Sequence, residues 1–454
     1  MAHDTTAAPA ENQTGLKRAV GTWLLFAFIV GDTLGAGIYT LVGTMATDVG
    51  GVIWLPLLIA LVVALLTAGT YAELITKYPH AGGAARYVDK AFGIPFLSFI
   101  VGFLMMASGI TTAAALANAF AGDYFASLID IPPVPVAIAF IAILTLINLR
   151  GVKESLATNM VASMIEVTGL VIVIVVAAVV FGSGGGEPSR IFEFAPDVPP
   201  LEGAFAASIV AFFSFLGFEA AANMAEEVKN PSRAYPRALF GAILTAAVVY
   251  LLIALGAVIV VEPTTLADST GPLLEVITAS GLAVPGWLFA LIALVAIANG
   301  ALLFMVMASR VGYGLAESGL LPHAFGKVLP KRRTPWVSIV VVAGATMLLT
   351  VVGDISTLAN TTVLLLLLVF LTANVSVLVL KKDKVDHKHF SVPRIVPILA
   401  IIASIVLLTQ QDWPVWAATG GYIVVGSVLF FVARFGRRRG DRKIAERTGA
   451  IDTV

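Results

Sequence analysis

The sequence predicts an all-α polytopic membrane protein with twelve transmembrane helices, on three observations. Its residues are 59% hydrophobic and only 12% charged, with a mean hydropathy of +0.96, so they cannot cover a water-soluble globule with polar surface. Long apolar runs recur from Val20 to Phe431, each near the roughly 20 residues that cross about 30 Å of hydrocarbon as a helix. With a cytoplasmic N-terminus and twelve spans, every Lys and Arg except Arg190 falls on the cytoplasmic side.

The predicted spans occupy most of the chain. Their approximate cores are residues 20–43, 51–72, 93–121, 132–149, 157–182, 203–225, 236–261, 284–312, 335–352, 355–380, 392–409 and 413–433. We expect two five-helix repeats and two further helices, over residues 19–182, 203–380 and 392–433. Residues 1–18 are polar and predict a disordered cytoplasmic tail, and residues 434–454 predict a basic cytoplasmic C-terminal tail. The expected location is the cytoplasmic membrane, with both termini in the cytoplasm.

Composition also excludes several classes of protein. The chain has no cysteine, and its five histidines lie in the N-terminal tail or in predicted loops, so neither a disulfide nor an intramembrane metal site is predicted. No cofactor is implied, and no intramembrane Ser/His or Cys/His constellation indicates an enzyme. A net charge of zero gives no indication of nucleic acid. Basic clusters at residues 381–388 and 434–447 indicate orientation, with binding of anionic membrane lipid as the alternative.

Three acidic residues lie inside the predicted spans: Asp32, Glu166 and Glu219. An ionisable group at bilayer depth costs a few kcal/mol, so it normally faces protein or a water-filled interior and marks a functional site. The alternative is an acid that is protonated, or paired with a backbone donor, and only ties helices together.

Two of these acids sit beside glycines that weaken their helices. The first span contains Gly31-Asp32 and then Gly35-Ala36-Gly37, and the sixth contains Gly217-Phe218-Glu219. Glycine weakens a helix by about 1 kcal/mol relative to alanine, so both spans are predicted to unwind at the midplane. They are corresponding members of a five-plus-five repeat, in which two broken helices meet at a substrate site. The alternative is a pair of glycine packing faces, a pattern that Gly31 and Gly35 also satisfy.

The predicted breaks suit a ligand with both a carboxylate and an ammonium group. Free N–H groups around residues 35–37 would bind an anion, and free carbonyl groups near residues 213–216 would bind a cation. An α-amino acid carries both groups. The predicted substrate-binding residues are Asp32, Thr33, Leu34, Gly35, Ala36, Gly37, Phe213, Phe215, Leu216 and Gly217.

Three separated motifs resemble one known family. They are "GDTLGAGIY" from Gly31, "YAELITKYPHAGGAARYV" from Tyr71 and "FFSFLGFEAAANMAEEVKNPSRAYPRA" from Phe212. In this order they resemble amino acid permeases of the amino acid-polyamine-organocation superfamily, closest to the bacterial branch that is similar to cationic amino acid transporters. The resemblance implies the five-plus-five inverted-repeat (LeuT-like) fold with the last two helices outside the repeat, transport by alternating access without ATP, and an aromatic gate at Phe213, six residues before Glu219.

Two positions depart from the family pattern. Asp32 stands where a small or apolar residue is usual, and an acid there would bind a substrate amine. Glu166 stands where some proton-using bacterial members carry a lysine, and a glutamate can take up a proton or coordinate a cation. We therefore expect proton-coupled transport, with Glu166, Glu219 and Asp32 as the coupling groups. A transporter of amines or polyamines, or an amino acid/amine exchanger, is the alternative.

The acids at the cytoplasmic ends of the spans are expected to form ion pairs. Glu73 and Glu226-Glu227 lie within reach along the chain of Lys77, Lys229 or Arg233. We expect such pairing rather than direct contact with substrate.

Overall fold

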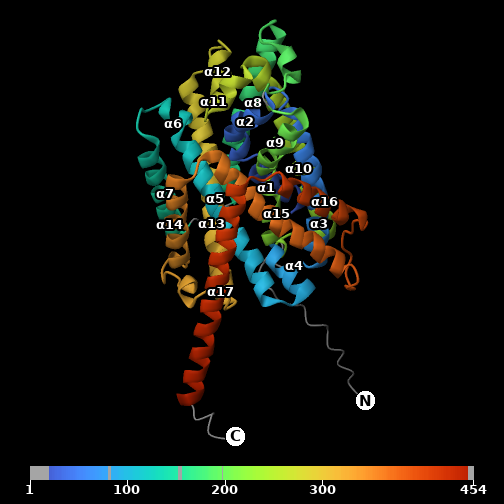
Figure 1. The fold of residues 1–454 in the computed structure, drawn as a ribbon, viewed down its shortest axis with the longest axis vertical. Coiled ribbons are helices and arrows are strands. Elements are labelled where there is room, and N and C mark those ends of the chain that lie inside the picture. Colours follow the sequence, from blue (N-terminus) through green and yellow to red (C-terminus); the bar gives the residue numbers. More distant parts are fainter. Residues whose placement is uncertain (1–19, 80–82, 152–155, 197, 448–454) are drawn as a thin grey trace, which may run out of the picture.

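A computed structural model describes residues 20–79, 83–151, 156–196 and 198–447. Within these ranges the protein is helical, with one isolated β-bridge between Val20 and Val228 (Figure 1). In chain order the elements are α1 (Thr22–Thr33), α2 (Ala36–Val49), α3 (Trp54–Lys77), α4 (Gly83–Phe92), α5 (Pro95–Ala121), α6 (Asp123–Ala126), α7 (Pro133–Arg150), α8 (Leu156–Gly182), the 3-10 helix η1 (Pro188–Phe192), α9 (Pro200–Ser214), the 3-10 helix η2 (Phe218–Met224), α10 (Pro231–Val260), α11 (Pro263–Asp268), α12 (Pro272–Ala279), α13 (Gly286–Glu317), the 3-10 helix η3 (His323–Gly326), α14 (Trp336–Val352), α15 (Ile355–Leu380), α16 (Ile395–Thr409) and α17 (Trp413–Arg447).

Apolar helices cover all twelve segments that the sequence predicts. In the described part of the chain, nine helical stretches are long and apolar enough to cross a bilayer, the first of them running through α1 and α2. The three remaining segments are shorter apolar helices, α9, α14 and α16. The protein is therefore a helical, multi-pass membrane protein. The predicted tail at 1–18 lies outside the described residues, whereas α17 continues as a helix through the basic residues to Arg447.

Two of the segments are interrupted at the predicted glycines. In the first, α1 ends at Thr33 and α2 begins at Ala36, with Leu34 and Gly35 between them. In the sixth, α9 ends at Ser214, a turn follows, and the chain continues as the tighter η2. Gly217 in that turn has a φ of +118°, a conformation that only glycine adopts without strain. The helical hydrogen-bond ladder is thus broken in both segments.

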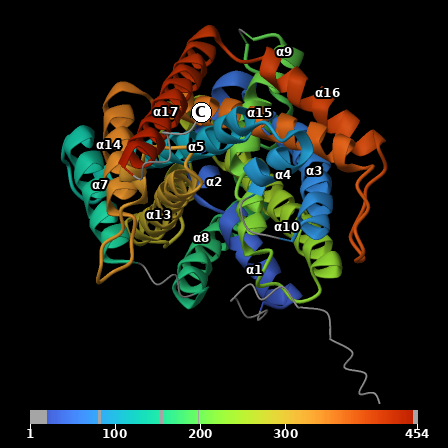
Figure 2. The ribbon, with the colours of Figure 1, turned by 90° about the horizontal axis from the view of Figure 1, so that it is seen from below.

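The helices pack in two groups that meet at the interruptions. One group contains α1, α3, α9, η2 and α10, and the other contains α5, α7, α13 and α14. Figure 2 shows α7, α13 and α14 on one side of the molecule and α3, α4 and α10 on the other. Helix α8 contacts α1 and α10 of the first group and α13 of the second. Helix α15 contacts α3 and α9 of the first group and α5 of the second, so both helices border the two groups.

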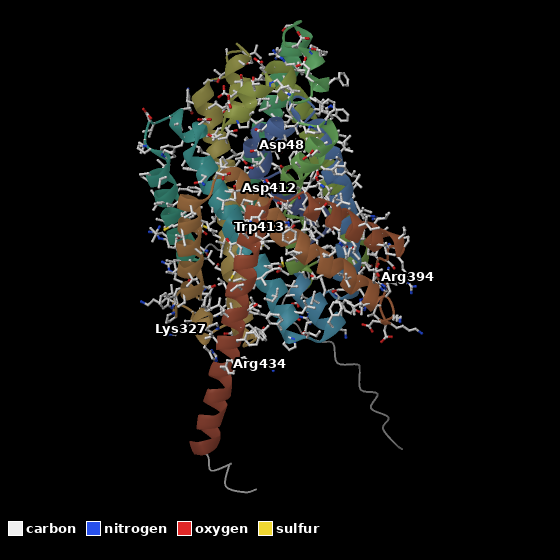
Figure 3. The ribbon with its side chains drawn as sticks, viewed as in Figure 1. Asp48, Lys327, Arg394, Asp412, Trp413 and Arg434 are labelled. Atoms are coloured by element: carbon white, nitrogen blue, oxygen red, sulfur yellow. The ribbon has the colours of Figure 1, made fainter. Side chains whose placement is uncertain are left out.

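The labelled basic and acidic side chains lie at different levels along the long axis of the molecule (Figure 3). Lys327, Arg394 and Arg434 lie toward the end that carries α4, and Asp48 and Asp412 lie nearer the opposite end (Figure 3). The short helices α11 and α12 also lie at that opposite end (Figure 1). This polarity agrees with the one-sided distribution of Lys and Arg in the sequence.

Candidate functional site

The two interruptions lie directly against each other. A Cβ atom added to Gly37 would come within 3.0 Å of Ser214 Cα, so the first turn of α2 contacts the last turn of α9 at backbone distance. A Cβ atom at Gly217 would lie 3.2 Å from Asp32 Cγ, which puts the carboxyl group of Asp32 beside the turn of the sixth segment. Glycine at both positions permits this approach.

A small cavity lies at this junction. It measures about 20 Å³ as the space open to the centre of a water molecule, which is enough for water but not for a larger ligand. Its walls come from both groups of helices and from α8. Of the residues that the sequence predicts for the site, those in the wall are Asp32, Thr33, Gly35, Ala36, Gly37, Glu166, Phe213 and Leu216.

Four predicted site residues are not among the described residues that line the cavity. Leu34 and Phe215 are buried behind the wall, and Phe215 packs on the ring of Tyr250. Gly217 forms the turn. Glu219 is 2% exposed, and its Oε2 accepts a hydrogen bond of 2.9 Å from the Gly217 N–H, so it holds that turn in shape.

The wall also contains residues outside the predicted substrate-binding set, although Ser214 lies in the range 213–216 whose carbonyl groups were predicted to bind a cation. They are Gly31, Leu116 of α5, Ser214 of α9, and Asn299, Gly300, Leu303 and Phe304 of α13. The amide of Asn299, next to a glycine in the middle of an apolar helix, was a signal in the sequence. Leu116, Leu303 and Phe304 carried no such signal, because apolar residues fill every span and only the packing selects these three.

The site is acidic and lacks a basic partner. No Lys or Arg is among the described residues that line the cavity. Asp32 interacts electrostatically with both Glu219 and Glu166. Glu166 is 1% exposed, and its Oε1 has no hydrogen-bond partner among the described residues. That oxygen would lie 3.9 Å from a Cβ atom on Gly35, so the Glu166 carboxyl faces the interruption of the first segment.

The helix ends around the cavity differ in how their backbone groups are satisfied. No side chain caps the N-terminus of α2, and its first N–H groups have no partner within the helix. At the C-terminal ends of α1 and α9, the Tyr250 hydroxyl contacts the carbonyl oxygens of Thr33 and Ser214. The hydroxyls of Thr33 and Ser214 are buried, with no hydrogen-bond partner among the described residues. The arrangement can therefore offer N–H and O–H donors to an anion and the carboxyl of Asp32 to a cation. No group of three metal-ligating side chains occurs among the described residues.

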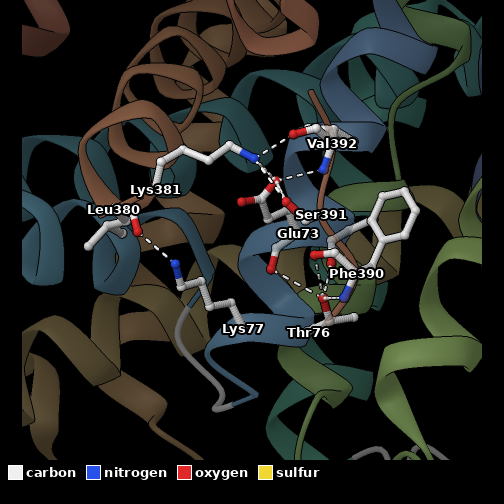
Figure 4. A network of polar contacts seen from close by, with 9 residues as sticks. Glu73, Thr76, Lys77, Leu380, Lys381, Phe390, Ser391 and Val392 are labelled. Carbon is white, nitrogen blue, oxygen red and sulfur yellow. Dashed lines mark hydrogen bonds and ion pairs between the residues drawn. The ribbon is translucent and has the colours of Figure 1, made fainter. Parts of the chain in front are cut away.

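The second motif has a different role, because it ties α3 to the connection between α15 and α16 (Figure 4). Glu73 is 1% exposed and pairs with Lys381 over 2.5 Å, and its carboxylate also accepts from Val392 N at 2.8 Å. Lys77 donates to the carbonyl of Leu380, which ends α15. The expectation that Glu73 forms an ion pair is confirmed, but the partner is Lys381 and not Lys77. Glu73 and Lys381 lie 308 residues apart in the chain, so the sequence alone could not predict this contact.

Further hydrogen bonds extend this network. The Thr76 hydroxyl accepts from Phe390 N at 3.0 Å, and the Tyr78 hydroxyl donates to Asp383 Oδ2 over 2.5 Å. The bond from Tyr78 holds the pKa of Asp383 below its usual range, so this acceptor stays ionised at neutral pH. The motif residues Glu73, Thr76, Lys77 and Tyr78 are therefore structural in this protein.

Fold and site together define a multi-pass helical membrane protein with two interrupted helices around an acidic cavity. The chain belongs to the amino acid permease family, whose sequence model matches residues 20–435. It is 25% identical over 452 residues to the branched-chain amino acid permease BcaP of Bacillus subtilis (strain 168), covering 94% of this chain and 95% of that protein. It is 31% identical over 380 residues to the vacuolar cationic amino acid transporter 4 of Arabidopsis thaliana, covering 79% of this chain and 62% of that protein. It is 27% identical over 458 residues to the methylthioribose transporter of Bacillus subtilis (strain 168), covering 94% and 96% of the two chains.

We predict that Lys381→Gln lowers the stability of the protein more than Lys384→Gln. Lys381 is only 11% exposed and is bonded to Glu73, so its loss leaves a buried carboxylate without its cation, at a cost of about 1–3 kcal/mol. Lys384 lies exposed in the same connection and serves as the matched control. Thermal unfolding of the two purified variants measures the difference. Equal melting temperatures for both variants would show that the ion pair does not hold α3 to the connection.

Proposed function

We propose that the protein is a secondary active transporter that moves an α-amino acid across the cytoplasmic membrane by alternating access. The observation that carries the proposal is the pairing of the uncapped N-terminus of α2 with the carboxyl of Asp32 across one small cavity. The N–H groups at residues 35–37 bind the substrate carboxylate, and Asp32 binds the ammonium together with carbonyl groups near residues 213–216. Family membership supports the amino acid as the substrate class.

The proposed transport cycle uses the two helix groups. The ten helical segments from α1/α2 to α15 form the two inverted repeats, with α16 and α17 outside them, and the interrupted members of the repeats carry the site. The group of α1, α3, α9, η2 and α10 rocks against the group of α5, α7, α13 and α14, so the cavity opens to each side in turn. Because the cavity now has room only for water, it must widen to admit an amino acid.

The orientation follows from the basic residues. Residues 327, 394 and 434 lie toward one end of the molecule, which we assign to the cytoplasm together with both termini (Figure 3). The cavity then lies between the two membrane surfaces, as alternating access requires.

Asp32 tests the proposed function directly. If its carboxylate contacts the substrate ammonium, Asp32→Asn removes a charge-assisted hydrogen bond worth about 2–3 kcal/mol, which is roughly a 30-fold to 150-fold loss of affinity. Asn keeps the size, so the N–H groups of residues 35–37 should still favour a free carboxylate. The measurement is competition binding with L-leucine against isopentylamine and L-arginine against agmatine, in wild type and variant. We expect an amino acid to outcompete its own amine in both proteins.

The same competition decides between the candidate substrates. An amine carrier would bind the decarboxylated compound more tightly already in the wild type, because a carboxylate would meet Asp32 as a like charge. Methylthioribose belongs in the panel, since one relative is named for it. Tighter binding of the amine, or binding of methylthioribose alone, would reject an amino acid as the substrate.

We further propose that Glu166 carries the coupling proton. It is buried against the first interruption, has no basic partner in the cavity wall, and can exist there as a charged group only at a large cost in free energy. A proton that binds from one side and leaves to the other neutralises it. Glu219 differs because its Oε2 accepts a hydrogen bond from the Gly217 N–H.

We predict that Glu166→Gln removes most of the dependence of uptake on a pH gradient, whereas Glu219→Gln keeps it. Gln has the size of Glu but cannot exchange a proton, so substrate binding should persist without coupling. Uptake of radiolabelled amino acid into proteoliposomes, with and without an inward proton gradient, measures the effect. An unchanged pH dependence in Glu166→Gln would take this residue out of the coupling step, and a strict requirement for sodium would reject proton coupling.

A further inference from the structure

Tyr250 of α10 connects the ends of the two interrupted helices. It is fully buried, and its hydroxyl contacts the carbonyl oxygen of Thr33, the last residue of α1, and that of Ser214, the last residue of α9, at 2.8 Å. A phenol has one hydrogen to donate, so the two carbonyls share it. One side chain thus satisfies backbone groups that both interruptions leave open.

The ring of Tyr250 is held in one orientation. Phe215 packs edge-on against it, with ring centroids 5.3 Å apart and an interplanar angle of 69°. Phe215 lies in the turn that follows α9, so the turn itself fixes the side chain that binds the helix end. The burial of Phe215 outside the cavity wall follows from this contact.

Both bonded carbonyls lie close to the groups that form the cavity. Thr33 precedes the interruption that leads into the N-terminus of α2, and Ser214 is the residue that Gly37 approaches. A shift of either helix end would change the distance between the N–H groups of α2 and the last turn of α9. The position of those N–H groups decides how well a ligand carboxylate fits.

We propose that Tyr250 is a positioning residue for the substrate site, which holds the C-terminal ends of α1 and α9 at one fixed separation. This inference rests on the proposed function, because it assigns Tyr250 to the amino acid site described above. Tyr250 does not line the cavity or contact the substrate. It acts through the backbone of the two interruptions, so its removal lets each helix end move separately and lowers affinity by about tenfold.

The test compares Tyr250→Phe with Tyr235→Phe. Tyr235 is also a fully buried residue of α10 whose hydroxyl donates to a backbone carbonyl, that of Ala221 in η2, at 2.9 Å. Its loss removes one buried hydrogen bond of the same kind, away from the ends of α1 and α9. Comparing the two variants therefore distinguishes the effect of the bonds to α1 and α9 from the general effect of losing a buried tyrosine hydroxyl.

The first readout needs no substrate. Amide hydrogen exchange in nanodiscs should become about tenfold faster or more at residues 30–38 and 211–216 in Tyr250→Phe, and Tyr235→Phe should leave both regions unchanged. The second readout is uptake of radiolabelled L-leucine and L-arginine, in which Tyr250→Phe should raise the KM about tenfold with a maximal rate within threefold of wild type. Incorporation of 4-aminophenylalanine at position 250, which places an N–H donor at the same ring position, should restore both. If Tyr250→Phe does not fold, 4-fluorophenylalanine, which fills nearly the same space but cannot donate, replaces it.

The outcomes separate this inference from the proposed function. Unchanged exchange in Tyr250→Phe, or the same changes in Tyr235→Phe, would overturn the positioning role. A KM within twofold of wild type despite faster exchange would also overturn it. If Tyr250→Phe exchanges faster but the wild type takes up neither amino acid, Tyr250 still holds α1 and α9 together and the proposed substrate is rejected.

Discussion

The structure depends on how backbone groups at two broken helices are satisfied where little water is available. An unpaired N–H or C=O group in the hydrocarbon region costs several kcal/mol, which is why irregular backbone survives there only inside protein or beside a cavity. Here the carbonyl ends of α1 and α9 share the Tyr250 hydroxyl, and the Gly217 N–H is bonded to Glu219. No side chain caps the N-terminus of α2, where we propose that the substrate carboxylate binds. Helix α10 also packs against α1, and α2 packs against α9.

The three acids of the site differ in their hydrogen-bond partners. Oε2 of Glu219 accepts a hydrogen bond from the Gly217 N–H of the turn, whereas Oε1 of Glu166 has no hydrogen-bond partner among the described residues. Asp32 interacts with both of them and borders the cavity. This difference in hydrogen bonding is why we propose a local structural role for Glu219, and a substrate cation and a proton as the partners of Asp32 and Glu166. Away from the cavity, the pairing of Glu73 with Lys381 shows that buried charge can also serve architecture alone.

Much of the fold could be predicted from the sequence, because apolar length and charge distribution report directly on a bilayer. The interruptions at Gly35 and Gly217 could be predicted for the same reason, since glycine beside an acid is costly within an apolar helix. Contacts between distant segments could not. Tyr250 is one aromatic residue in an apolar span, and nothing in its local sequence identifies the two carbonyls it reaches. Phe215 was predicted to face the substrate, whereas it supports Tyr250 behind the wall, because sequence cannot tell which side of a turn a side chain takes.

The most direct test is a structure of the protein in a lipid nanodisc with a transported amino acid bound. The account predicts density for the ligand between α2 and the turn after α9, with its carboxylate within hydrogen-bonding distance of the N–H groups of residues 35–37 and its ammonium beside Asp32. Density with the ammonium at the N-terminus of α2, or a ligand bound away from both interruptions, would contradict the claim that the broken helix ends form the substrate site.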